Sequence, residues 1–374
     1  MTIEKLFEVA KSKGISDVQV FLSHKNELSI EVFAGNLEKY EISDSTSLVV
    51  RGIYQQKMAT YSTEVLDDSM IESIVSHLIE NAKIIDSPDE AIMYAGDDHY
   101  EELKDLYRPS LSEWDVSNKI DMVKALDQKI HSADDRVSIV ETMYSEETKE
   151  VLLQNTKGLK LYNKVNGAMV GAQVIVKNDV DQRTNFDLIV SNDINDFQFD
   201  DLVQEMVSDA TNSLGAKPIP SGNYPIVFKN TAFATLLAAF AGVFSAESVQ
   251  KGYSLLKGKL NTVIGAPIVT LVDDPFLKKS HNSRSIDDEG VATKYKELIK
   301  NGTLTTYLHN LTTAKKDNVT STGNGFNGSV SPINLVLLPG EQSKDDLIAA
   351  MKDGLFITDV QGAHAGANSV SGDF

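Results

Sequence analysis

Alternating apolar and polar residues characterise the first part of the chain. The runs DVQVFL, LSIEVFAG, LEKYEIS and TSLVVRGIYQQKMATYST are rich in β-branched residues and are separated by glycine or asparagine turns. This pattern predicts a four-strand meander. Helical spacing of apolar residues near 2–13 and in DDSMIESIVSHLIENAKI predicts a helix on each side of it.

The same plan is repeated in the next part of the chain. SEWDVSNKIDMVKALDQKIHS has the pattern of a capped helix, and FDDLVQEMVSDATNSL has that of a closing helix. Between them lie RVSIVETMYSEE, KEVLLQNT, LKLYNKVN, AMVGAQVIVKN and TNFDLIVSND, which have the pattern of strands. EVFAGNLEKYEIS in the first part also resembles EVLLQNTKGLKLYNKV in the second. We interpret the two parts as an internal duplication whose sequences have diverged.

The segment GAKPIPSGNYP at 215–225 contains three prolines and marks the sharpest boundary. After it, short buried strands, a turn at Asn301-Gly302 and a few helices follow. The sequence therefore predicts an α+β protein with two helix–meander–helix units, 1–105 and 106–218, and a strand-rich C-terminal domain, 219–374. The last recognisable segment, SGDF, leads us to expect that this domain is truncated at its end.

The stretch FATLLAAFAGVF, from Phe233 to Phe244, is apolar or small on every side. Phe233, Leu237, Phe240 and Phe244 share one helical face, and alanines occupy much of the rest. A helix of this kind is expected to be buried among close neighbours. It also carries no side chain suited to acid–base chemistry or metal binding.

Composition narrows the function classes. The 374 residues carry a formal charge of -19 and no long basic segment, which argues against a nucleic-acid partner. There is no cysteine, so neither disulfides nor thiolate ligands can form. The first residues lack a signal-peptide pattern, and no apolar run has the length of a membrane span. We expect a cytoplasmic protein that binds no membrane.

Candidate chemical groups are few. None of the seven histidines is at metal-ligand spacing, although His281, His309 and His364 could meet through folding to form a zinc site. Carboxylates gather in two short segments: Asp273, Asp274, Asp287, Asp288 and Glu289. They could hold a hard cation or form an acid–base pair. The alternative, favoured by the preference of aspartate for turns, is that they bond to nearby backbone groups.

A glycine-rich segment, STGNGFNG, spans Ser321–Gly328. It lacks the Lys-Ser/Thr ending of a phosphate-binding loop, and no G-x-S-x-G nucleophile pattern occurs in the chain. Glycines let another backbone approach closely. We therefore predict peptide or partner contacts at Ser321, Thr322, Gly323, Asn324 and Gly325, and at the turn formed by Asp287, Asp288, Glu289 and Gly290.

The third region resembles the TldD/PmbA (TldD/TldE) family, whose members are sometimes called modulators of DNA gyrase. The resemblance rests on SAESVQKGYSLLKGKL, VTLVDDP, RSIDDEGVATKYKELIKNGTLTTYLHNLTTAKK, STGNGF and GLFITDVQGAHAGANSVSGDF, in matching order over about the last 150 residues. The two earlier units fit the family's N-terminal part less specifically.

The resemblance carries an expectation about the apolar helix. TldD-like members are metalloproteases with a His-Glu-x-x-x-His motif just before the segment matching QKGYS. Aligned through QKGYS, the histidine positions fall on Leu237 and Gly242 and the glutamate position on Ala238. None of these can bind zinc or transfer a proton, and the family's cysteine ligand has no counterpart here. The helix is thus expected to be a pseudo-active site of the PmbA/TldE type.

By this resemblance, the chain is expected to be a non-catalytic subunit of a heteromeric cytoplasmic metalloprotease that degrades or matures unfolded peptides. Zinc is expected only in a TldD-like partner, with no cofactor in this chain, which alone could form a homodimer. Two alternatives remain open. One is a stand-alone binding protein that modulates DNA gyrase, and the other is a peptidase with an unrecognised metal site, for example at Asp287.

Overall fold

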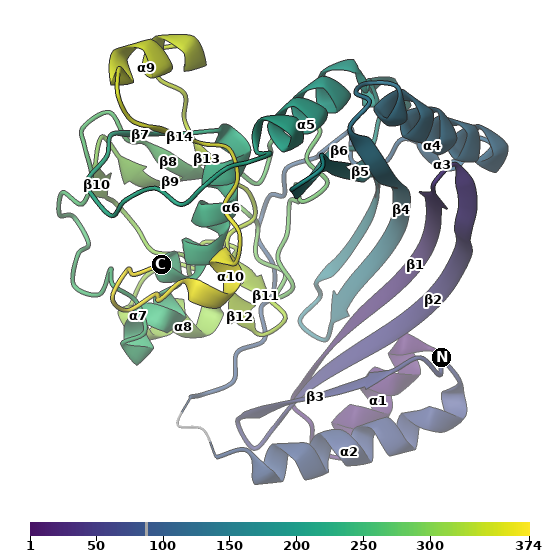
Figure 1. The fold of residues 1–374 in the computed structure, drawn as a ribbon. Coiled ribbons are helices and arrows are strands. Elements are labelled where there is room, and N and C mark those ends of the chain that lie inside the picture. Colours follow the sequence, from purple (N-terminus) through teal and green to yellow (C-terminus); the bar gives the residue numbers. More distant parts are fainter. Residues whose placement is uncertain (87–88) are drawn as a thin grey trace.

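The computed structural model describes residues 1–86 and 89–374. Its largest element is a six-stranded antiparallel sheet of order β3-β2-β1-β4-β5-β6 (Figure 1). The strands are β1 (Asp17–Phe33), β2 (Asn36–Tyr54), β3 (Lys57–Thr63), β4 (Val137–Asn155), β5 (Lys160–Lys177) and β6 (Gln182–Ser191).

Each predicted meander has fewer and longer strands than its apolar runs indicated. The first two runs join as β1, because the polar segment Ser23–Glu27 stays paired with β2 on one side and β4 on the other. The third run and the first part of the fourth join as β2, and the rest of the fourth forms β3. A strand ends where its hydrogen-bonding partners end, and not where its side chains become polar. The predicted four-strand count was therefore wrong for the first unit.

Helix, three strands, helix nevertheless occurs twice along the chain. The first unit contains α1 (Ile3–Ser12), the 3-10 turn η1 (Asp68–Met70) and α2 (Ile71–Ile84). The second contains α3 (Pro109–Ser112), α4 (Val116–His131), η2 (Ile194–Asp196) and α5 (Asp200–Asn212). Descent by duplication remains a prediction, and so does the division of the two units at 105/106. In the structure, β1 of the first unit pairs directly with β4 of the second.

Two helical layers cover the same face of the long strands. Side chains alternate along a strand, so even-numbered residues of β1 share one face. Val18 and Val20 pack into the core under α1 and α2, whereas Ile30 and Val32 pack into a second core under α4 and α5. Figure 1 shows these layers at opposite ends of the sheet. The odd-numbered face is left for another part of the chain.

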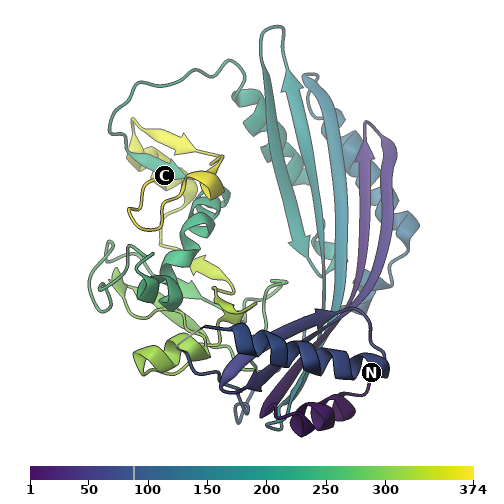
Figure 2. The same ribbon diagram turned by 90° about the horizontal axis from the view of Figure 1, so that it is seen from below.

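The third region forms smaller sheets beside the large one (Figure 2). A four-stranded sheet has the order β10-β9-β8-β13, and two strand pairs, β11–β12 and the parallel pair β7–β14, complete the region. The bounds are β7 (Ile226–Phe228), α6 (Asn230–Phe240), η3 (Ala241–Phe244), α7 (Ala246–Lys251), β8 (Leu271–Asp273), β9 (Lys296–Lys300), β10 (Thr303–Leu304), α8 (Leu311–Asp317), β11 (Gly325–Phe326), β12 (Ser329–Val330), β13 (Leu335–Leu337), α9 (Lys344–Met351), β14 (Leu355–Ile357) and α10 (Ala363–Gly366).

The turn and the helix start that the sequence predicted in this region are confirmed. Asn301 and Gly302 both have positive φ, 48° and 79°, and join β9 to β10 as the predicted tight turn. Ser343 caps α9 through a bond from the amide of Asp346 to its hydroxyl. Over the described ranges, no helix combines the length and apolar character needed to cross a membrane.

Candidate functional site

The two segments singled out in the third region lie together, although more than 30 positions separate them. The amide of Gly325 donates to the Asp287 carboxylate at 2.9 Å, and the amide of Asp288 donates to the Gly325 carbonyl at 3.0 Å. The amide of Asn327 donates to the Asp288 carboxylate at 2.9 Å. The turn and the glycine-rich loop therefore form one unit.

Asp287 is the centre of this unit. Its Oδ1 accepts hydrogen bonds from the amides of Glu289 at 3.0 Å and Val291 at 2.9 Å, while Oδ2 accepts from Gly325. Burial, reinforced by the nearby Glu289 carboxylate, raises the pKa of Asp287 to about 7. The three backbone donors act in the opposite direction and hold the carboxylate in place.

Glu289 connects the turn to α8. Its Oε2 accepts a hydrogen bond from the amide of Leu311, the first residue of α8, at 2.8 Å. The same carboxylate lies against Gly325, where an added Cβ would come within 2.7 Å of Oε2. Burial raises the pKa of Glu289. A side chain at position 325 would therefore displace the Glu289 carboxylate from the amide of Leu311.

Hydrogen bonds of buried side chains hold the glycine-rich loop in place. Asn324 is buried, and its Nδ2 donates to the carboxylate of Asp273 at 2.8 Å and to the carbonyl of Ser331 at 2.9 Å. Ser321 donates to the carbonyl of His309 at 3.1 Å. Asp273 also pairs with Lys296 at 3.2 Å, and both side chains are buried.

Exposure differs along the predicted contact residues. Ser321, Gly323, Asn324 and Gly325 are buried in this chain and Thr322 is half-buried, whereas the tip at 327–329 is exposed. In the turn, Asp287 and Gly290 are buried, and Asp288 and Glu289 are half-buried. A contact role for these residues stays a prediction. The exposed tip is the part of the loop that a partner can reach directly.

The turn is seated on the face of the large sheet that the helices leave free. Gln19 of β1 and Arg51 of β2 each donate a hydrogen bond to the carbonyl of Asp288 at 3.2 Å. Tyr100 donates to the carbonyl of Gly290 at 2.8 Å. Gly290 has φ +87°, and a Cβ there would lie 2.3 Å from Leu159. The first two units thus form the support for the turn.

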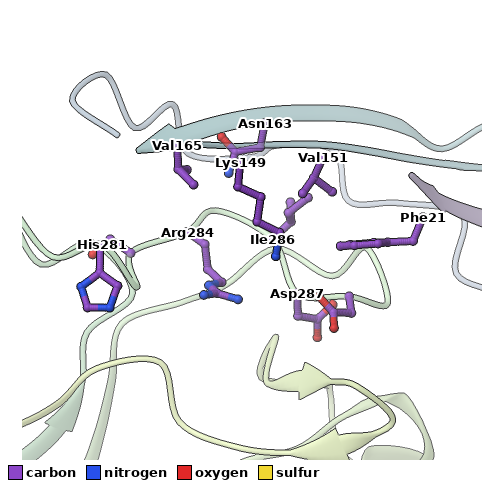
Figure 3. A pocket seen from close by; sticks show the side chains of 11 residues that line it. Phe21, Lys149, Val151, Asn163, Val165, His281, Arg284, Ile286 and Asp287 are labelled. Carbon is purple, nitrogen blue, oxygen red and sulfur yellow. The ribbon is translucent and has the colours of Figure 1, made fainter. Parts of the chain in front are cut away.

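A cavity of about 80 Å³ lies between this sheet face and the segment before the turn (Figure 3). Phe21, Lys149 and Asn163 line it from the sheet, and His281 and Arg284 line it from the third region. Phe21 and Lys149 are at odd positions, which places them on the helix-free face. The complete lining is Phe21, Lys149, Val151, Asn163, Val165, His281, Ser283, Arg284, Ile286, Asp287 and Asp288.

The apolar helix α6 is less buried than its composition predicted. Ala232 is its only buried residue, and Ala234, Thr235 and Ala238 are exposed, as is Gly242 in η3. The prediction of a core helix was wrong because composition does not tell how many neighbours a helix has. One side of α6, including Leu237, lines a cavity of about 640 Å³ that it shares with β7, β13 and α9.

The acidic residues accept hydrogen bonds from nearby backbone amides, as their turn positions indicated, and several also bond to groups far along the chain, as Asp287 does to Gly325. Besides Asp287 and Asp288, Asp274 accepts a hydrogen bond from the amide of Phe276 at 2.9 Å. Over the described residues, no group of three or more acidic, histidine or cysteine side chains is arranged to hold a metal ion. His281 lines the small cavity and His309 is buried elsewhere. The side chain of His364 lies outside the described part.

Three further residues of the site escaped the sequence analysis: Lys149, Arg284 and Lys296. Lys149 shares one strand face with Val151 and Leu153 and has no distinguishing motif, so only the register of β4 against β1 places it beside the turn. Lys296 opens β9, and its partner Asp273 ends β8 on the adjacent strand. The pairing of these strands was the missing information.

We expect Asp287 to titrate near neutral pH. Its pKa in the fold lies above the value of about 4 for an unfolded aspartate, so the unfolded chain releases the proton first. The contribution of this group to the free energy of unfolding therefore falls as pH rises from about 4 to about 7, and is constant above that. The 13C carboxyl shift of Asp287, assigned through its loss in Asp287→Asn, measures the midpoint.

Substitution of Glu289 should move this midpoint. Glu289→Gln removes the neighbouring charge and should lower the pKa of Asp287. Glu297→Gln removes a half-buried carboxylate that pairs with Lys300 and serves as the charge-matched control. A midpoint near 4 in the wild type would contradict the buried environment described for Asp287.

Comparison with known proteins covers nearly the whole chain. Family models described as PmbA/TldA metallopeptidase domain 1, central domain and C-terminal domain match residues 18–83, 109–214 and 221–374. A crystal structure from Thermotoga maritima, described as a candidate modulator of a DNA gyrase, is 34% identical with a TM-score of 0.91, and the match covers 99% of this chain and 84% of that one.

Two more relatives are informative. A protein named metalloprotease from Methanocaldococcus jannaschii is 24% identical over 96% of this chain and 80% of its own length. The crystal structure of TldE from Thermococcus kodakarensis has a TM-score of 0.83 at 21% identity, covering 96% of this chain and 83% of that one. At that identity, the similarity to TldE shows the fold alone.

Proposed function

Because the chain belongs to the PmbA/TldD metallopeptidase family, we propose that it is a non-catalytic subunit of a heteromeric metalloprotease acting on unfolded peptides. Its partner would be a TldD-like subunit that supplies the zinc ion and the general base. This chain would stabilise that partner and complete the path of the peptide.

The observation that carries the proposal is the composition of α6 and the turn after it. By the resemblance described above, Leu237, Ala238 and Gly242 are expected at the positions of the family's two histidines and glutamate. A hydrocarbon side chain or a hydrogen atom neither ligates zinc nor accepts a proton from water. Any zinc-dependent cleavage by the assembly must then use ligands from the partner.

Strand edges in the third region support a role in holding peptides. The pair β7–β14 is two-stranded among the strands described, so each strand has an edge available to a further strand. Ile226 and Phe356 in this pair are exposed. An extended peptide can add to such an edge through main-chain hydrogen bonds, independent of its sequence. Main-chain recognition suits a substrate class of unfolded peptides.

Mixing the purified chain with its TldD-like partner tests the proposal. We expect cleavage of an unfolded peptide to rise at least tenfold in the mixture over the partner alone, and this chain alone to cleave nothing above background. A chelator should abolish the activity of the mixture, and added zinc should restore it. These controls assign the metal to the assembly.

Two outcomes would overturn the proposal. Zinc-dependent cleavage by this chain alone would show a metal site of its own. Equal activity of the partner with and without this chain would make it dispensable for proteolysis. In that case, direct binding to DNA gyrase becomes the next function to measure, because the Thermotoga maritima relative is described as a candidate modulator of a DNA gyrase.

A further inference from the structure

Two cations, Lys149 and Arg284, share the small cavity under the turn, and neither forms an ion pair with another described residue. Within the described part of the chain, Lys149 makes neither an ion pair nor a hydrogen bond. Among the described residues, Arg284 donates from Nε alone, to the carbonyl of Asn282 at 3.0 Å. Four of the five guanidinium N–H groups therefore have no acceptor in residues 1–86 and 89–374. Figure 3 shows the two side chains approaching the same space, Lys149 from the sheet and Arg284 from the third region.

The carboxylates around these cations are engaged elsewhere. Glu147 pairs with Lys25 at 2.8 Å. Asp287 is held by three backbone amides, as described above, and the Asp288 carboxylate accepts from Asn327 at 2.9 Å. Their hydrogen bonds leave the N–H groups of Lys149 and Arg284 available. One side of the cavity therefore carries cations with free N–H donors. The other side carries carboxylates that already accept hydrogen bonds from backbone amides.

Partial burial of two cations without an ion pair in this cavity is unfavourable for their charged forms. Burial lowers the pKa of Lys149, and the charges of Lys25 and Arg284 act in the same direction, whereas those of Glu147 and Asp288 oppose the shift. Burial also lowers the pKa of Arg284, against the opposing charge of Asp288. A charge removed from water is tolerated best when an opposite charge with hydrogen bonds compensates it. An anion in the cavity would provide this compensation.

The guanidinium of Arg284 is held in a restricted orientation before any anion binds. Its guanidinium lies over the ring of Phe326, 5.0 Å from the centroid, which limits the orientations of its planar donor group. A guanidinium with free N–H groups matches the two oxygens of a carboxylate, and a lysine adds a third charged donor. The cavity volume of about 80 Å³ is well below the roughly 300 Å³ of pockets that enclose whole ligands. It admits a carboxylate group and little more.

We propose that Lys149 and Arg284 form a binding subsite for a peptide carboxylate, either the C-terminal group or an Asp or Glu side chain. The inference rests on the proposed role in peptide binding and adds an anchoring point on the sheet face opposite the helices. Asn163, which lines the same cavity from β5, offers an uncharged donor beside the two cations.

Peptide binding to the chain alone tests this subsite. The probe is a fluorescent, otherwise uncharged octapeptide with one internal Glu, prepared with a free or amidated C-terminus and with Glu or Gln. Fluorescence anisotropy should show at least tenfold weaker binding when the recognised carboxylate is removed. Loss on amidation identifies the C-terminal group, and loss on Glu-to-Gln exchange identifies the side chain. Equal binding of all four peptides would overturn the proposal.

Variants of the chain provide the second arm. Lys149→Met and Arg284→Gln should each weaken binding of the carboxylate peptide at least tenfold. Lys164→Met is the control, because Lys164 lies on the opposite face of the same sheet and pairs with Glu150 at 2.9 Å. It should change affinity less than twofold. Wild-type affinity in both cavity variants would contradict the assignment.

Thermal unfolding separates loss of the subsite from loss of the fold. Lys149→Met removes an unpaired cation, so its Tm should equal or exceed that of the wild type, measured without peptide. The test is also independent of cleavage by the mixed subunits. Carboxylate-dependent binding without partner-dependent cleavage would support the subsite and reject the subunit role. Partner-dependent cleavage without carboxylate-dependent binding would support the subunit role and reject the subsite.

Discussion

Replacement of Asp273 by Ala is expected to lower the free energy of unfolding by about 3–5 kcal/mol, the range for breaking a buried ion pair from one side. Asp273 is fully buried and bonds to Lys296 at 3.2 Å and to the amides of Ile333 at 2.8 Å and Asn334 at 2.9 Å. It also accepts from Asn324 of the glycine-rich loop at 2.8 Å. Removing the carboxylate leaves a buried cation and three further donors without their acceptor.

Lys300→Ala is the matched control for this variant. Lys300 lies on the same strand as Lys296 and pairs with Glu297 at 2.7 Å, but its side chain is exposed. An exposed pair of this kind contributes about 0–1 kcal/mol. Urea unfolding at neutral pH gives both values. Similar small losses for the two variants would contradict the importance that we assign to the buried pair.

Replacement of Gly323 by Ala is expected to lower the free energy of unfolding by about 2–4 kcal/mol. Gly323 has φ +69°, which costs a residue with a side chain about 1 kcal/mol. A Cβ would also lie 2.6 Å from the carbonyl oxygen of Ala292 and 2.8 Å from the Cα of Thr293. Backbone atoms cannot turn aside as a flexible side chain can, so strain of about 1–3 kcal/mol is added.

Gly328→Ala separates these two contributions. Gly328 follows Gly323 in the same segment and has a similar φ of +78°, but nothing lies within 4 Å of an added Cβ. It should therefore show only the conformational cost of about 1 kcal/mol. Thermal or urea unfolding of both variants gives the difference. Equal losses would mean that the close approach of the loop to residues 292–293 is not a constraint.

These variants also affect different parts of the site. Gly323 and Asp273 fix the interior of the glycine-rich loop, whereas Lys149 and Arg284 line the cavity on the other side of the turn. A variant that destabilises the loop can therefore reduce peptide binding through the fold. The cavity variants should reduce it with the fold retained, and unfolding measurements distinguish the two cases.

Much of the local structure followed from sequence alone. Apolar periodicity placed the main helices and the β-rich regions, the Asn301-Gly302 pair marked the β9–β10 turn, and Ser343 marked the start of α9. Each of these signals depends on neighbours within a few residues, where backbone preferences and hydrogen bonds are local. The interpretation of Leu237, Ala238 and Gly242 as replacements of the family's zinc-binding side chains also came from the sequence, and it stays a prediction.

Tertiary structure alone decided how these elements meet. The runs of the first two units join into one sheet because β1 pairs with β4, and Gln19 reaches Asp288 across 269 positions. The exposure of α6 and the unpaired state of Lys149 depend on which neighbours packing supplies. Burial and ion pairing are properties of neighbours in space, and strand register sets them over long sequence separations. The cavity and its cations therefore required the fold to be seen.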